Sequence, residues 1–149
     1  MIKHSLTVLA FVVISFAVQG TSHFIINANH YAAIDFLRPE PWVPFGIGVM
    51  LVQGTLATIA LEVWKGQQAT VLDGVKLSGL LGIFLGAYIA VAEPSKYSAP
   101  SMVEWIAVEA PSSLVQFLVF GVVLGAIHAR FGRASLREAK LQDAPVTHR

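Results

Sequence analysis

The chain contains no cysteine and few charged residues. The first absence excludes cysteine-based sites, and the second argues against a soluble domain. Without cysteine it cannot form disulfides, thiolate metal sites or a cysteine nucleophile. Only 13% of its 149 residues are charged and 55% are hydrophobic, whereas soluble domains carry about 25% charged residues. The sequence has no glycine-rich phosphate loop, zinc-protease motif, serine elbow or basic nucleic-acid patch. We therefore expect the lipid bilayer, and no nucleic acid, as a partner.

Four apolar runs make up most of the chain. A helix needs about 20 residues to cross the hydrocarbon layer. The first, second and fourth runs reach this length with their uncharged flanks, and the third is at the lower limit. The sequence therefore predicts an all-α fold, a single antiparallel bundle of four transmembrane helices, built on the runs 6–18, 42–63, 77–91 and 114–129.

The distribution of basic residues predicts the orientation of this bundle. Lysine and arginine beside spans mark the cytoplasmic side. With the amino terminus inside, eight of the ten basic residues lie inside, and only Arg38 and Lys96 lie outside. Both termini are predicted to be cytoplasmic. We expect a membrane domain over residues 1–132 and a cytoplasmic tail over 133–149, which starts as a short interfacial helix and becomes partly disordered.

Two segment boundaries stay open at this point. Residues 1–20 fit either a cleaved signal peptide or a retained anchor, and we favour the anchor because apolar sequence continues through 24–26. The fourth helix begins either at Ser101, whose spacing to Glu104 makes a capping box, or at Pro111, which suits a first helical position. We favour Pro111, because residues 111–129 alone are long enough to span.

A polar stripe continues from the first apolar run. Gln19, His23, Asn27 and His30 are spaced by four, four and three residues. On a helix this spacing puts their side chains on one face, within an arc of about 80°. Counting about 1.5 Å per residue places Gln19 inside the membrane, His23 at its outer edge, and Asn27 and His30 beyond it. The stripe is therefore predicted to form one wall of a polar vestibule.

A second stripe is expected to form the opposite wall. Glu109, Ser113 and Gln116 are spaced by four and three residues on the fourth helix, and Glu93 follows the third. Polar groups in a bilayer usually face the bundle interior or a wet cavity. We therefore predict that the two stripes meet and line a ligand-binding vestibule on the outer side.

A metal site is the most specific chemical hypothesis for these residues. His23, His30 and Glu109 are the candidate ligands for a divalent ion. The two histidines lie about 10 Å apart along a helix axis, so one ion cannot take both without a bend. The workable pairs would instead be His30 with Glu93 or Glu109, and His23 with Glu109. Histidines bonded to neighbouring loops and headgroups explain the pattern without a metal, and we favour that interpretation, with no cofactor assigned.

Two further histidines, His4 and His128, fall near the inner surface. A haem between them would need both rings on facing helices at one depth. That fit is poor, because His4 lies in a terminus that is expected to fray.

Several outer-side segments carry a resemblance. Residues 22–24, His30 with Tyr31, residues 93–97, Trp105 and Glu109 resemble the corresponding parts of small four-helix bacterial inner-membrane proteins of unknown function. The resemblance implies a multi-pass protein of the bacterial inner membrane, and it implies no activity.

Three function classes follow from these patterns. The leading hypothesis is a non-enzymatic accessory or ligand-binding membrane protein with a polar vestibule on the outer, periplasmic side. The first alternative is a small transporter or channel subunit that acts as a homo-oligomer or in a larger membrane complex, since four short helices rarely enclose a pathway. The second is a membrane metalloenzyme that uses His23, His30 and Glu109. Catalysis is not excluded, but no residue set argues for it.

Overall fold

The fold is described from a computed structural model that covers residues 1–38, 40–97 and 99–142. Every secondary-structure element in these ranges is helical. Four stretches are long and apolar enough to cross a membrane, namely Ile2–Ile26, Val43–Gln68, Val71–Ala92 and Met102–Arg137. The predicted all-helical fold with four candidate spans is therefore confirmed.

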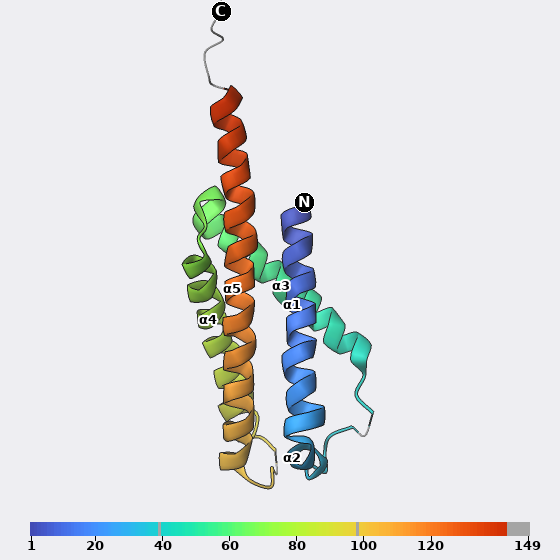
Figure 1. Ribbon diagram of the computed structural model, residues 1–149. Coiled ribbons are helices and arrows are strands. Elements are labelled where there is room, and N and C mark those ends of the chain that lie inside the picture. Colours follow the sequence, from blue (N-terminus) through green and yellow to red (C-terminus); the bar gives the residue numbers. More distant parts are fainter. Residues whose placement is uncertain (39, 98, 143–149) are drawn as a thin grey trace, which may run out of the picture.

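The first half of the chain forms two long helices that cross. α1 (Ile2–Thr21) continues through a π-helical turn (η1, Ser22–Ile26) into the short helix α2 (Ala28–Ala32). After a loop, α3 (Val43–Lys65) returns obliquely and passes behind α1, which it contacts (Figure 1). Because of this oblique path, the beginning of α3 stands away from the lower end of α1.

The second half forms a closely packed helical pair. A 3₁₀ turn (η2, Gly66–Gln68) leads into α4 (Val71–Ala87), which ends in a π-helical turn (η3, Tyr88–Ala92). α5 (Met102–Gln142) then runs beside α4 and α1 and projects beyond them, so that the N-terminus and the end of α5 lie toward the same end of the molecule (Figure 1).

The third helix begins before its apolar run. The run starts at residue 77, but α4 starts at Val71. The Thr70 hydroxyl accepts a hydrogen bond from the Asp73 amide (3.2 Å), and the Asp73 carboxylate accepts one from the Thr70 amide (3.0 Å). This capping box satisfies the free amides of the first turn. Lys65 also pairs with Asp73 at 3.1 Å, so the polar residues of this segment start a helix.

The preferred start of the fourth helix at Pro111 was wrong. α5 begins at Met102 and passes through Pro111 without interruption. Ser101 provides the cap, since its hydroxyl accepts a hydrogen bond from the Glu104 amide (3.2 Å). Proline removes one backbone donor from a helix interior, but neighbouring helices and serine hydroxyls make this tolerable in membrane helices. Here the Ser112 hydroxyl donates to the Val108 carbonyl at 2.6 Å.

The residues expected to form the cytoplasmic tail continue α5. The helix passes residue 132 without a break and ends at Gln142, so the expected short interfacial helix is not a separate element. The remaining part of the predicted tail, 143–149, lies outside the described residues.

Small residues let α4 and α5 approach closely. In lipid the hydrophobic effect does not drive helices together, so close packing of small side chains takes that role. Gly74, Gly82 and Gly86 are buried on the face of α4 that meets α5. Gly121 and Gly125 meet the same face from α5. Gly79, which lies on another face of α4, meets open space instead.

An apolar core joins α1, α3 and α5 near the middle of the molecule. The ring of Phe11 lies edge-on against that of Phe120, with 4.7 Å between centroids, and 5.9 Å from that of Phe117. Leu61 and Leu124 complete the buried cluster from α3 and α5. This core separates two groups of polar side chains, one toward α2 and the other toward the N-terminus.

Candidate functional site

A large pocket opens between α1, α2, α5 and the first part of α3. Its volume is about 1160 Å³, slightly above the range of about 300–1,000 Å³ typical of small-molecule sites. Most of its wall is apolar or aromatic, and most of its polar side chains lie on α1, η1, α2 and α5. The polar and charged lining residues are Ser15, Gln19, His23, Tyr31, Asp35, Arg38, Gln53, Glu109, Ser113 and Gln116.

The two predicted polar stripes meet in this pocket. The Gln19 amide nitrogen donates to Gln116 Oε1 at 2.7 Å, and the Gln116 amide nitrogen donates to the Ser15 hydroxyl at 2.8 Å. These bonds connect α1 to α5 across the pocket wall. Gln19 Oε1 is buried without a hydrogen-bond partner. The prediction that the stripes face each other is confirmed for Gln19 and Gln116, while ligand binding by the stripes stays a prediction.

Tyr31 connects the histidine of the first stripe to the carboxylate of the second. Its hydroxyl donates to Glu109 Oε1 at 2.6 Å. Its ring stacks on the imidazole of His23, with 3.8 Å between centroids and 13° between planes. Burial, and then the hydrogen bond to Glu109, raise the pKa of the Tyr31 phenol well above its ordinary value. Tyr31 therefore stays protonated at physiological pH and acts as the donor to Glu109.

The tautomer of His23 follows from its backbone contact. His23 Nδ1 lies 2.9 Å from the carbonyl oxygen of Gln19. A carbonyl only accepts hydrogen bonds, so Nδ1 carries the hydrogen and Nε2 of the neutral ring has a free lone pair. His23 lines the pocket, to which it contributes a hydrogen-bond acceptor.

The other predicted site residues lie outside the pocket lining. Asn27 donates to the Ser22 hydroxyl at 3.0 Å. His30 Nδ1 lies 3.1 Å from Glu104, and Glu93 lies 3.7 Å from Lys96 Nζ. Because η1 and a bend precede α2, the stripe does not continue as one straight helical face, and its last two members point elsewhere.

The expected metal ligands do not form a ligand set. Within the described ranges, no three histidine, cysteine, aspartate or glutamate side chains are grouped closely enough to hold an ion. His23 stacks on Tyr31, His30 pairs with Glu104, and Glu109 accepts from Tyr31. Each member of the predicted triad therefore has a different partner.

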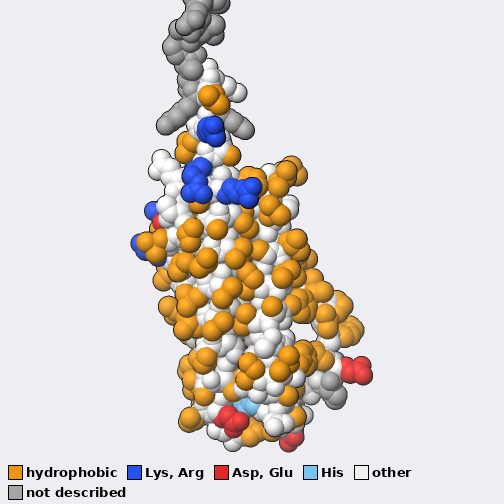
Figure 2. Space-filling model, viewed as in Figure 1, with side chains coloured by type: hydrophobic (Ala, Val, Ile, Leu, Met, Phe, Trp, Pro, Cys, Tyr) orange, Lys and Arg blue, Asp and Glu red, His pale blue; other side chains and the backbone are white. Residues whose placement is uncertain are grey.

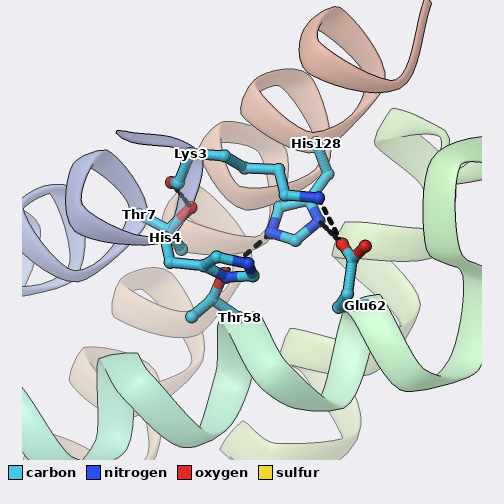
Figure 3. Close-up of polar contacts among 6 residues, drawn as sticks. All are labelled: Lys3, His4, Thr7, Thr58, Glu62 and His128. Carbon is cyan, nitrogen blue, oxygen red and sulfur yellow. Dashed lines mark hydrogen bonds and ion pairs between the residues drawn. The ribbon is translucent and has the colours of Figure 1, made fainter. Parts of the chain in front are cut away.

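A second polar site, which we call the histidine cluster, joins α1, α3 and α5 near the N-terminus (Figure 3). It consists of Lys3, His4, Thr58, Glu62 and His128. The Thr58 hydroxyl lies between two imidazoles, 2.9 Å from His4 Nδ1 and 2.8 Å from His128 Nε2. Lys3 donates to the Glu62 carboxylate, and His128 Nδ1 lies 3.5 Å from the same carboxylate. The cluster ties the ends of three helices together.

Tyr31, Thr58 and Glu62 had no predicted role, and His4 and His128 were weighed only as a poor haem pair. His4 was expected to fray, but it lies in the first turn of α1, which begins at Ile2. Thr58 and Glu62 are four residues apart and therefore share a helix face. This spacing is the sequence signal from which the polar site on α3 could have been predicted. His128 is 1% exposed, and a buried ionisable residue in an apolar helix is by default a functional candidate.

The chain matches no known family model, no curated protein and no solved structure. The function must therefore be argued from the geometry of the two sites.

Proposed function

We propose that this chain is a multi-pass membrane protein that binds a small amphipathic molecule in its large pocket, without catalysing a reaction. The observation that carries the proposal is the pocket itself, with a volume of about 1160 Å³. Apolar and aromatic side chains such as Phe24, Trp42 and Met50 line most of it, and hydrogen-bonding groups gather at Gln19 and Glu109. This combination suits a ligand with an apolar body and one polar head group.

The proposed setting is the bacterial inner membrane, with four antiparallel spans and both termini in the cytoplasm. Eight of ten basic residues fall on the inner side in this orientation, as the positive-inside rule requires. On the face drawn in Figure 2, lysine and arginine gather toward the end where α5 projects, and acidic side chains lie at the opposite tip. The pocket then opens on the periplasmic side.

Single-cysteine labelling tests this orientation, since the chain has no cysteine of its own. Ser95 and Gln68 are both exposed and lie in connections at opposite ends of the fold. A membrane-impermeant maleimide is expected to label Ser95→Cys in intact cells, and Gln68→Cys only after the membrane is permeabilised. Labelling of Gln68→Cys in intact cells, and of Ser95→Cys only after permeabilisation, would show that the orientation is opposite to the proposed one.

Two glycines of α3 provide a matched test of the pocket. Gly46 lines the pocket and Gly48 does not, and a side chain at either position meets open space. Gly46→Trp is expected to fill part of the cavity and weaken binding of a fluorescent alkyl probe to the solubilised protein by about tenfold or more, which corresponds to roughly 1.4 kcal/mol. Gly48→Trp adds the same side chain on the same helix and should leave the affinity unchanged.

Equal effects of the two tryptophans would contradict a specific pocket. The same holds if neither variant changes probe binding, because the probe would then bind the lipid-facing surface. Circular dichroism of both variants establishes that the helices are retained.

A further inference from the structure

Glu109 is buried in the pocket wall without a cationic partner. Its side chain is on α5, lines the pocket and is only 6% exposed. Its one hydrogen bond comes from the neutral Tyr31 hydroxyl. None of the ion pairs within the described residues involves Glu109. A buried ionised carboxylate is unfavourable unless it is paired, so a positive charge placed beside Glu109 would stabilise its ionised form.

The neighbouring polar groups also accept hydrogen bonds. His23 has its free lone pair at Nε2, because Nδ1 bonds to the Gln19 carbonyl. Gln19 Oε1 is buried without a donor. Together with the second oxygen of Glu109, these groups give the polar end of the pocket three acceptors, beside two groups that can also donate, the Ser113 hydroxyl and the second N–H of the Gln19 amide. An ammonium group has three donors and no acceptor, and it fits this arrangement better than a carboxylate or phosphate.

The aromatic residues of the pocket suit the apolar body of the ligand. Tyr31, Trp42 and Trp105 line the pocket, and each stacks on a neighbouring ring, that of His23, Phe45 and Phe36 respectively. At the mouth, Asp35 and Arg38 are both exposed, so their opposite charges offset each other and are screened by solvent. The field inside the pocket is therefore set by Glu109.

We propose that the ligand is a cationic amphiphile, with an alkyl or aryl body in the apolar part of the pocket and a protonated amine at Glu109. This inference rests on the proposed binding function, and it specifies the charge of the head group. The ammonium would donate to Glu109 and to the acceptors of Gln19 and His23, while Tyr31 keeps the carboxylate in place.

Three probes with the same dodecyl chain separate charge from hydrophobicity. We suggest measuring the affinity of dodecylammonium, dodecanol and dodecanoate for the full-length protein in nanodiscs, against empty nanodiscs. Dodecylammonium is expected to bind most tightly. Glu109→Gln should weaken the binding of dodecylammonium by about tenfold or more, as expected for loss of a charged hydrogen bond. The affinity for dodecanol should stay unchanged. Glu104→Gln is the matched control, because Glu104 lies on the same helix and pairs with His30 outside the pocket.

The outcomes distinguish this inference from the function on which it rests. If dodecanol or dodecanoate binds at least as tightly as dodecylammonium, or if Glu109→Gln leaves the ammonium affinity unchanged, the cationic ligand is excluded and the pocket remains a binding site. If no probe binds above the empty-nanodisc level, both the ligand class and the proposed function are overturned.

Discussion

Replacing Gly74 by alanine is expected to destabilise the protein by about 3 kcal/mol, the upper range for overpacking a closely packed contact. A β-carbon on Gly74 would lie 2.5 Å from the Gly121 carbonyl oxygen and 2.5 Å from Gly125 Cα. These atoms belong to the backbone of α5 and cannot move aside as a flexible side chain would. The two helices would have to separate, and the contacts of Ser78 and Gly82 along the same interface would loosen with them. Reversible unfolding in mixed micelles, followed by circular dichroism, gives the free energy of unfolding.

Gly79→Ala is the matched control on the same helix. A β-carbon there meets nothing within 4 Å, so no overpacking is expected, and the better helix propensity of alanine acts in the stabilising direction. Equal stability of the two variants would show that α4 and α5 do not pack through Gly74.

Thr58→Val is expected to destabilise the protein by about 2 kcal/mol, since buried groups that lose their hydrogen-bond partners are typically destabilising by about 1–3 kcal/mol. Valine has nearly the shape of threonine, so the change removes the hydroxyl and little else. The hydroxyl serves both His4 Nδ1 and His128 Nε2, and His128 is 1% exposed and has no access to water as a substitute partner. One substitution therefore removes one of the two links that join α1, α3 and α5, and leaves the contacts of Lys3 and His128 with Glu62.

Thr55→Val tests whether this effect belongs to the histidine cluster. Thr55 lies on the same helix, is exposed, and uses its hydroxyl only for the Leu51 carbonyl of its own helix (2.7 Å). Its replacement should change the free energy of unfolding by less than about 0.5 kcal/mol, as is usual for surface positions. Similar losses in both variants would mean that the bridging hydroxyl of Thr58 adds nothing to stability.

The features that follow from local periodicity were predictable from the sequence. The four apolar runs gave the helices, and the three- and four-residue spacing of Gln19, His23, Glu109 and Gln116 placed these residues in a common pocket. Both inferences depend only on helix geometry and on the tendency of polar groups to avoid lipid.

The features that depend on contacts between distant segments were not predictable in the same way. The π-helical turn before α2 rotates His30 toward Glu104, and no spacing rule reports such a turn. Pro111 was taken as the helix start because residues 111–129 alone are long enough to span, but α5 begins at Met102 and packs against α4 and α1. The cluster of His4, Thr58 and His128 requires the oblique crossing of α3, which is a tertiary property.

The central claim is that the large pocket is a ligand site whose polar end is Glu109. A density map of the protein, extracted from its own membrane into nanodiscs without added ligand, tests it most directly. We expect the first part of α3 to stand away from the lower end of α1 as in Figure 1, with discrete non-protein density that ends within hydrogen-bond distance of Glu109 and Gln19. A map in which the first part of α3 packs directly onto α1 and α5, so that no cavity remains, would contradict the claim.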